Sequence, residues 1–375
     1  MRMIKSKGNK MKVVMNCLMI MLVMGVLAGC KDKEPEVKED TKENIVIEMP
    51  EQEEKEVEEE DTKPLGNENL LTGEYTLPDH AIGKRPVAVM VSNVEAAMPQ
   101  YGITPADIIF EMPVEGNLTR FMALYSDYST LPTICSVRSC RDYFPSLSEG
   151  FDAFYIHWGM DESIRPHYEA MDLDKFDGTY NDGQLFGRDS ERKANGYATE
   201  HTGLVKGPEL SKAIDKAGMR TELLKDKQKP AFQFAKYNTT ITPDGVDCTQ
   251  VAIDFGATTA EFEYDSEEKN YKKQFNGKDQ KDGKTKEQLA FTNVFVLETV
   301  ITPRPESPGR VDVNWEGGKN AKGYYISNGK KQEIRWSKEN EDADLRFFDL
   351  EGNELGINRG KSYIAFNYPN QATYK

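Results

Sequence analysis

The sequence predicts a mixed domain, α+β or α/β in class, followed by a β-rich domain. Two observations predict this order. In the first half of the chain, compact apolar runs typical of strands alternate with short helical segments. From about residue 230 onward, short β segments are separated by Asn-Gly, Asp-Gly and Gly-Asn turns, which are typical of hairpins. We therefore expect the mixed domain over residues 70–229. The β-rich domain, a twisted sandwich or a small barrel, is expected over 230–375.

The first 29 residues show the three-part pattern of an export signal. Five basic residues precede an apolar run from Val13 to Leu27, and the small residues Ala28 and Gly29 come directly before Cys30. The run is about 15 residues long, shorter than the ~20 that a membrane-spanning helix needs. We expect cleavage before Cys30 and acylation of the mature protein, for example with palmitate, which anchors it to the outer face of the cell membrane. An ordinary secreted protein or an uncleaved anchor is the alternative.

Residues 31–63 hold fifteen acidic residues, six lysines and no aromatic residue. Such a segment cannot bury enough apolar surface to fold. We expect a disordered acidic tether over residues 30–69 that holds the folded domains away from the membrane. A charged helix over residues 51–61 is the alternative. Loss of the signal removes five basic residues and no acid, so the formal net charge changes from −15 to about −20. Nucleic acid is not an expected partner of so acidic a chain.

Five strands and two helices are predicted in the first half of the chain. The strands cover residues 86–91, 106–111, 119–125, 133–137 and 152–157, each an apolar run bounded by polar or turn-forming residues. The helices cover residues 141–149 and 209–217, the second with Pro208 at its start and Gly218 at its stop. In the second half, strands are predicted over residues 250–255, 260–264, 271–275, 289–298, 323–327, 332–336, 345–350 and 362–367, with a hairpin turn at 351–354.

Three cysteines remain after loss of the signal and use of Cys30, namely Cys135, Cys140 and Cys248. The number is odd, and a chain of this length does not need a disulfide framework. The spacing of Cys135 and Cys140 fits neither a redox Cys-x-x-Cys motif nor a common zinc spacing. We expect small buried residues, with a disulfide as the alternative.

Common catalytic motifs are absent from the sequence. It contains no Gly-x-x-x-x-Gly-Lys-Ser/Thr, no Gly-x-Gly-x-x-Gly after a strand, no His-Glu-x-x-His and no Gly-x-Ser-x-Gly. No cofactor or metal is therefore predicted, and the presence of any catalysis stays open.

Arginines gather where the predicted strands end. Arg138 and Arg141 flank Ser139 and lie on one face if this segment is helical, where they can hold a carboxylate or phosphate. The alternative is a structural network with nearby acids, namely Asp107, Glu111 and Glu115. A second group, residues 187–193, lies in a stretch typical of a long loop. It precedes Glu200 and His201, an acid-histidine pair that can act as a base or a ligand.

Ligands of α/β sheets usually bind at strand ends, so we expect these groups to share one cleft. The predicted ligand-binding residues are Asn93, Glu115, Arg120, Arg138, Ser139, Arg141, His157, Arg188, Asp189, Arg192 and His201. In the second domain, cations beside Trp336, together with Trp315, Tyr324 and Tyr325, suggest a surface for sugar rings. The alternative is a tryptophan in the core of a sheet.

Several segments in order resemble a known family. They are residues 85–93, 106–111, 114–121, 136–139 with 141–144, and 155–159, followed by 293–296 and 336–338. As a set they resemble the YerB-like lipoproteins of Gram-positive bacteria. The resemblance implies a lipoprotein with two domains of unknown function. The family often has Pro-His-Asn where this chain has Glu200-His201-Thr202, and a small residue at the position of Cys140, so Cys140 is not expected to be a nucleophile.

Three classes of function remain open. The first is a membrane-anchored envelope lipoprotein that binds a cell-wall polymer or a partner protein through the arginine-rich cleft. The second is a wall-acting enzyme that uses the same cleft, with Glu115 as acid or base and the arginines stabilising an anion. The third is a solute-binding lipoprotein, which usually has two similar α/β lobes.

Overall fold

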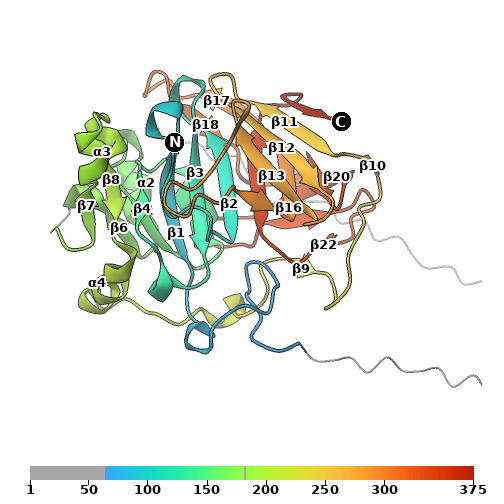
Figure 1. Ribbon diagram of the computed structural model, residues 1–375, viewed down its shortest axis with the longest axis horizontal. Helices are drawn as coiled ribbons and strands as arrows, with labels where there is room; N and C mark the ends of the chain where they lie inside the picture. Colours follow the sequence, from blue (N-terminus) through green and yellow to red (C-terminus); the bar gives the residue numbers. More distant parts are fainter. Residues whose placement is uncertain (1–63, 181–182) are drawn as a thin grey trace, which may run out of the picture. The chain divides into compact units, whose positions relative to one another are not determined.

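The computed structural model of the chain describes residues 64–180 and 183–375 (Figure 1). These residues belong to one compact unit. The predicted signal, Cys30 and most of the predicted tether lie outside the described residues. The fold begins before the predicted residue 70. Asn67 forms a β-bridge with Leu77, and Asn69 is 4% exposed and donates to Asp107 at 3.0 Å.

An eleven-stranded sheet forms the centre of the fold (Figure 1). Along the sheet its strands are β10 (Val246–Asp247), β20 (Lys330–Ser337), β19 (Gly317–Ser327), β16 (Asn293–Glu298), β23 (Ser362–Asn367), β2 (Ile108–Pro113), β3 (Thr119–Tyr125), β1 (Val87–Asn93), β5 (Phe154–His157) and β6 (Lys175–Asp177), with β21 (Arg346–Phe348) paired to β20. β23 pairs in parallel with both β16 and β2. Strands from both predicted domains therefore share one sheet, and a boundary near residue 230 stays a prediction.

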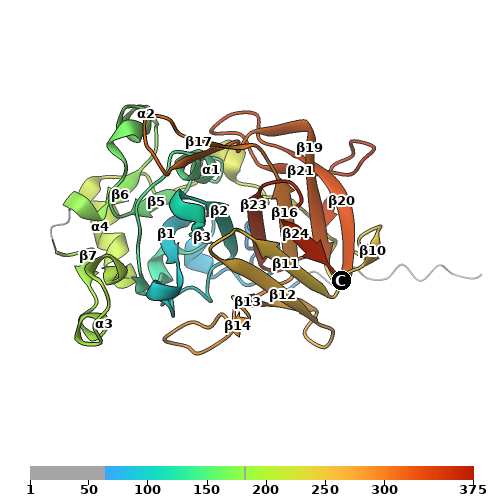
Figure 2. The ribbon, with the colours of Figure 1, turned by 90° about the horizontal axis from the view of Figure 1, so that it is seen from above.

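A six-stranded sheet packs on one face of the central sheet (Figure 2). It contains β14 (Lys278–Asp279), β13 (Asn270–Phe275), β12 (Thr259–Asp265), β11 (Gln250–Asp254) and β24 (Ala372–Tyr374), with β15 (Ala290–Phe291) paired to β13. This is the packing of a sandwich and not of a barrel. The predicted fold class, mixed α/β followed by a β-rich part, is confirmed.

Three small sheets, four short α-helices and nine single-turn 3-10 helices complete the described part of the chain. The small sheets are β17 (Ile301–Pro303) with β18 (Val311–Val313), β9 (Gln233–Phe234) with β22 (Gly356–Ile357), and β4 (Ile134–Cys135) with β8 (Gly203–Val205) and β7 (Phe186–Arg188). The α-helices are α1 (Tyr143–Glu149), α2 (Arg165–Ala170), α3 (Ser190–Ala194) and α4 (Leu210–Ala217). As predicted, α4 stops before Gly218, which caps it in a left-handed conformation.

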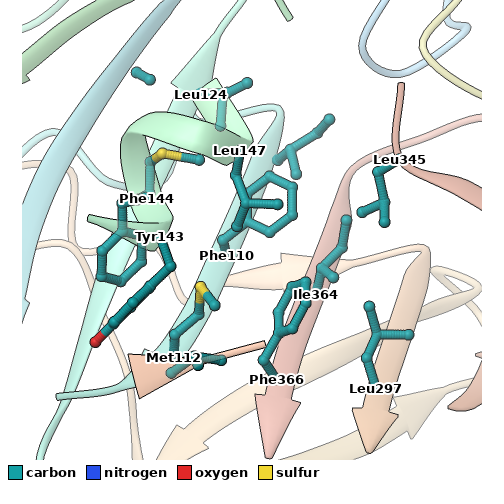
Figure 3. Packing of buried hydrophobic residues seen from close by; sticks show 14 of the residues in the cluster. Phe110, Met112, Leu124, Tyr143, Phe144, Leu147, Leu297, Leu345, Ile364 and Phe366 are labelled. Atoms are coloured by element: carbon teal, nitrogen blue, oxygen red, sulfur yellow. The ribbon is translucent and has the colours of Figure 1, made fainter. Parts of the chain in front are cut away.

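The central sheet is covered on both faces, which explains its continuous apolar strands. All seven residues of β1 are buried. Successive residues of β1 face opposite sides of the sheet, so Met90 packs in one core and Val91 in the other. Figure 3 shows the first core, where Phe144 and Leu147 of α1 lie over Phe110 of β2. The second core lies under the six-stranded sheet and α4.

Two local predictions are wrong. Residues 138–142 are not helical, because α1 begins only at Tyr143, so Arg138 and Arg141 do not share a helix face. Residues 187–193 are not a long loop either, since they contain the end of β7 and most of α3.

The three described cysteines and Trp336 are all buried. Cys135, Cys140 and Cys248 are buried and free, as the core interpretation predicted, and form no disulfide. Trp336 and Tyr325 are 0% exposed, so the sugar-binding surface suggested for them is wrong and the core interpretation is confirmed.

Candidate functional site

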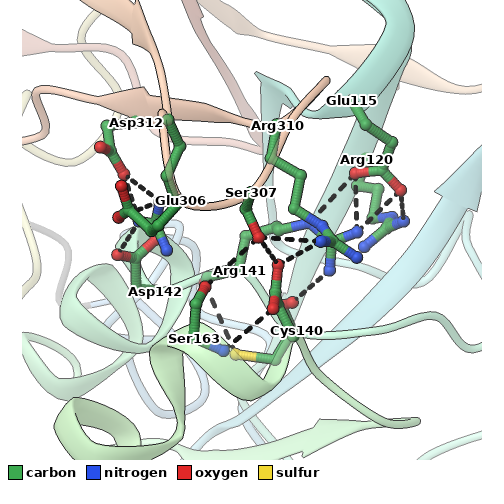
Figure 4. Close-up of polar contacts among 12 residues, drawn as sticks. Glu115, Arg120, Cys140, Arg141, Asp142, Ser163, Glu306, Ser307, Arg310 and Asp312 are labelled. Carbon is green, nitrogen blue, oxygen red and sulfur yellow. Dashed lines mark hydrogen bonds and ion pairs between the residues drawn. The ribbon is translucent and has the colours of Figure 1, made fainter.

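A glutamate between two buried arginines forms the centre of the candidate site. Glu115 lies in the turn between β2 and β3, Arg120 on β3, and Arg141 just before α1. Arg120 Nη2 lies 2.6 Å from Glu115 Oε1, and Arg141 Nη2 lies 2.7 Å from both carboxylate oxygens (Figure 4). Arg141 Nε also donates to Glu115 Oε2 at 3.0 Å. The Nη1 atoms donate to backbone carbonyls, that of Arg120 to Ser139 at 2.7 Å and that of Arg141 to Cys140 at 2.6 Å. The arrangement fixes the three side chains relative to one another.

Burial makes the charges of this group interact strongly. Arg120 and Arg141 are 4% and 5% exposed, whereas the Glu115 side chain is 34% exposed. Burial alone raises the pKa of Glu115, but the guanidinium groups of Arg120 and Arg141 outweigh it and lower that pKa to about 2. Burial, followed by repulsion from Arg141, lowers the pKa of Arg120 to about 10. Glu115 and Arg120 are therefore both charged at neutral pH.

Two further arginines extend the charged group. Arg138 Nη1 donates to the carbonyl of Glu200 at 3.0 Å, and Arg188 Nη1 donates to the carbonyl of Thr199 at 2.7 Å. The Arg188 guanidinium lies 4.0 Å from the ring centroid of Trp158, a cation–π contact. Both arginines are half-buried. Within residues 64–180 and 183–375, neither has a carboxylate within 4.0 Å.

Arg138 interacts electrostatically both with the Glu115 group and with Arg188 and Glu200. Burial lowers its pKa, Glu200 and Glu115 act in the opposite direction, and Arg141 and Arg188 add to the lowering. Coulombic interactions weaken with distance, so the groups that shift the pKa of Arg138 lie close to it. We call Arg120, Arg138, Arg141 and Arg188, with Glu115 and Glu200, the arginine cluster. Four arginines against two glutamates give it a formal charge of +2.

His201, Arg192 and Asp189 adjoin the cluster but serve the local fold. Arg192 is 1% exposed and donates to the carbonyls of His201 at 3.0 Å, Ala97 at 2.9 Å, and Pro99. Asp189 caps α3 by accepting from the backbone N–H of Arg192 at 2.7 Å. His201 is 9% exposed, and its Nδ1 has no partner among the described residues. Burial and then Arg138 lower the pKa of His201, which keeps it neutral at pH 7.

Two predicted site residues lie apart from the arginine cluster. His157 is 0% exposed, its Nδ1 donates to the carbonyl of Gly159 at 2.9 Å, and its Nε2 pairs with the hydroxyl of Tyr168. Burial lowers the pKa of His157. It is a packed histidine. Asn93 is also 0% exposed and points to the opposite face of the central sheet, where it donates to Glu111 at 2.8 Å.

The structural alternative for the arginines is correct for one of the three acids named. Glu115 pairs with Arg120 and Arg141. Asp107 instead accepts from Asn69 and from the backbone of Ser126, and Glu111 accepts from neutral side chains and faces a lysine.

The sequence did not reveal that the β17–β18 hairpin borders the site. Arg304 pairs with Asp142, next to Arg141, and with Asp312 of β18. Ser307 and Arg310, at the tip of the hairpin, both contact Asp161. Figure 4 shows Ser307 and Arg310 of this hairpin near Glu115 and Arg120. The contacts of Arg304 with Asp142 and of Ser307 with Asp161 join residues 162 and 146 positions apart, and no local pattern signals them.

Neither a metal site nor a spanning helix is seen in the part of the chain that the structure describes. No group of three His, Cys, Asp or Glu side chains there is placed to hold a metal ion. No helix there is long and apolar enough to cross a membrane. Two cavities lie outside the arginine cluster. One of about 490 Å³ is lined by residues between 66 and 86 and between 223 and 231, and another of about 630 Å³ lies between α2 and α4.

Comparison with known proteins assigns the family. Residues 71–220 match the N-terminal domain, and residues 251–364 the C-terminal domain, of a protein of unknown function, DUF3048. The chain is 30% identical over 265 residues to "Putative lipoprotein YerB" of Bacillus subtilis, which covers 68% of this chain and 74% of that protein. The chain belongs to the YerB-like DUF3048 family.

A solved structure agrees with this assignment. The crystal structure of the YerB protein from Bacillus subtilis superposes with a TM-score of 0.70 at 27% identity. The match covers 81% of this chain and 98% of that one. The family resemblance deduced from the sequence motifs is therefore confirmed. The homology supports a lipoprotein held at the membrane by a lipid, and both domains of the family are of unknown function.

Proposed function

We propose that this chain is an extracytoplasmic lipoprotein, acylated at Cys30, whose arginine cluster binds carboxylate groups of the cell wall. The observation that carries the proposal is that Arg138 and Arg188 donate to backbone carbonyls, with no carboxylate within 4.0 Å among the described residues. Their charge is available to a ligand at a half-exposed surface. Guanidinium groups bind planar carboxylates through paired hydrogen bonds, and Trp158 adds an aromatic face beside them.

Peptidoglycan fits this surface better than a densely charged polymer. The tether and the signal account for fifteen acids against eleven basic residues, so a formal net charge of about −11 remains on residues 64–375. That charge repels polyphosphates at long range, whereas the +2 cluster attracts a single carboxylate at short range. Stem peptides of peptidoglycan carry separate carboxylates on a sugar chain. The acidic tether lets the folded part reach the wall from the membrane.

The enzyme alternative receives less support from the same geometry. A general acid or base works best with a pKa near the operating pH. The pKa of Glu115 is about 2, because Arg120 and Arg141 stabilise its charged form. Glu115 therefore cannot donate a proton at neutral pH. The solute-binding alternative is also less favoured, since the two halves of the chain share one sheet and are not similar lobes.

Co-sedimentation with purified wall tests the proposal. We expect the protein to sediment with peptidoglycan from which anionic polymers have been removed, and the double variant Arg138→Ala/Arg188→Ala to stay in solution. The matched control is Arg335→Ala/Arg346→Ala, which removes the same charge from β20 and β21. Equal sedimentation of wild type and the cluster variant would show that the cluster does not bind the wall.

A further inference from the structure

A lysine is completely buried between the two large sheets, far from solvent. Lys273 of β13 is 0% exposed, and its Nζ lies 5.4–5.6 Å from three aromatic ring centroids, those of Phe121, Phe262 and Tyr363. Among the described residues its carboxylate partner is Glu111 of β2, which is 1% exposed, at 3.6 Å. Removal of an ammonium from water into such a site is costly unless strong hydrogen bonds satisfy it. Lys273 makes one other polar contact, 3.4 Å to the carbonyl of Gln274.

The carboxylate that faces Lys273 also binds Asn93. Asn93 Nδ2 donates to Glu111 Oε1 at 2.8 Å, and Lys273 Nζ faces the other oxygen, Oε2. Thr119 donates to Oε1 at 2.7 Å, and Tyr363 donates to Oε2 at 2.7 Å, which fixes the carboxyl group. One buried carboxyl group therefore holds an amine on one side and an amide on the other.

The side-chain carbonyl oxygen of Asn93 accepts hydrogen bonds from two side-chain amides. Gln100 Nε2 donates to Asn93 Oδ1 at 3.2 Å, and Gln280 Nε2 donates to it at 3.0 Å. Two donors aimed at an amide oxygen withdraw electrons from its carbon and stabilise the oxyanion that forms when a nucleophile adds. Asn93 is thus polarised toward attack, within a site that excludes water.

We propose that Lys273 and Asn93 form an intramolecular amide bond, with Glu111 as the proton-transfer group. The Lys273 ammonium gives one proton to the Glu111 carboxylate, and the resulting amine attacks Cγ of Asn93. The oxyanion on Oδ1 is held by Gln100 and Gln280. Glu111 passes its proton to Nδ2 and removes a proton from the attacking nitrogen. The Cγ–Nδ2 bond then breaks. The products are a secondary amide and ammonia, which leaves with the proton taken up by Glu111 as ammonium.

The electrostatics of the site agree with this sequence of steps. Burial lowers the pKa of Lys273, and Glu111 acts in the opposite direction. The neutral amine that the attack requires is thereby favoured relative to an exposed lysine. No oxidant or other co-reactant is needed. The bond would join β1 of the central sheet to β13 of the six-stranded sheet and close a loop from residue 93 to residue 273. A covalent link across so long a loop restricts the unfolded chain, as a disulfide does.

Peptide mapping of the native protein tests the proposal directly. The full-length protein is extracted from the membranes of producing cells, digested with trypsin under denaturing conditions and analysed by tandem mass spectrometry. We expect one branched peptide whose mass equals that of the Asn93 and Lys273 peptides joined with loss of one ammonia, with no cleavage after Lys273. Recovery of the two peptides separately, with unmodified Asn93 and normal cleavage after Lys273, would overturn the proposal.

The variant Lys273→Arg is the matched control because it keeps the positive charge and removes the nucleophile. Its Asn93 peptide is expected to be linear and unmodified. An ammonia loss that persists at Asn93 in this variant would assign the loss to cyclisation of the asparagine and contradict the amide bond. The wild-type map decides the question even if the variant is degraded in the cell.

Discussion

Replacement of Glu115 by glutamine is expected to destabilise the protein by about 2 kcal/mol at pH 7. The variant keeps the shape of the side chain but removes the charge that Arg120 and Arg141 share. The pKa of Glu115 is lowered from 4.5 to about 2, which corresponds to a contribution of at most about 3.4 kcal/mol to the free energy of unfolding. The Glu115 side chain is 34% exposed, so solvent screening reduces this to about 2 kcal/mol.

The same interaction predicts a pH dependence. The pKa of Glu115 is lower in the folded protein, so its contribution is fully present above the unfolded value of 4.5 and is lost as the pH falls toward 2. Equilibrium urea unfolding at pH 7 and at several values between 4.5 and 2 measures both effects. The stability difference between wild type and Glu115→Gln should shrink across this window.

Glu354→Gln is the matched control for this experiment. Glu354 pairs with Arg346 at 2.8 Å, but the two side chains are 40% and 49% exposed. We expect a change below about 0.5 kcal/mol, as for most surface ion pairs. If Glu115→Gln destabilises no more than this control, or if its effect is the same at pH 7 and pH 2, the electrostatic reasoning about the cluster is refuted.

Three further predictions concern two kinds of buried side chain, Trp336 and the cysteines, and the ion pairs of Arg304. Trp336→Ala should cost about 3–5 kcal/mol in urea unfolding because the side chain is 0% exposed, and a change below about 1 kcal/mol would contradict its place in the core. Iodoacetamide at pH 8 should not label Cys135, Cys140 or Cys248 until the protein is unfolded. Burial raises the pKa values of these thiols to about 12, 12 and 11, respectively. Labelling of the native protein would contradict this prediction. Arg304→Ala should speed hydrogen exchange in residues 304–310 by about tenfold, whereas Arg335→Ala should not.

The strands and helices that the sequence predicted are those whose signal is local. β1 and β3 contain compact apolar runs, and α4 follows a short turn that contains Pro208 and stops before Gly218. The order of the strands was not predictable. β23 lies between β16 and β2 because of pairings such as Ile108 with Ser362, which join residues about 250 positions apart. Such pairings leave no mark in a single sequence.

The candidate site was predictable only in part, because only some of its signals are local in the sequence. The arginines were found because several occur together at strand ends, and the structure brings Arg120, Arg138 and Arg141 close to Glu115. Asn93 follows a strand in the same way but faces the other side of the sheet, since neighbouring residues of a strand point to opposite faces. The direction of a side chain at a strand end depends on register, which the sequence pattern did not fix.

Calorimetric titration with a soluble disaccharide-peptide from peptidoglycan tests the central claim most directly. We predict that the purified protein binds it, that binding weakens as salt is added, and that Arg138→Ala/Arg188→Ala lowers the affinity at least about tenfold. The Arg335→Ala/Arg346→Ala control should bind like the wild type. Equal affinity of the cluster variant and the control for the fragment would contradict a role of the arginine cluster in wall binding.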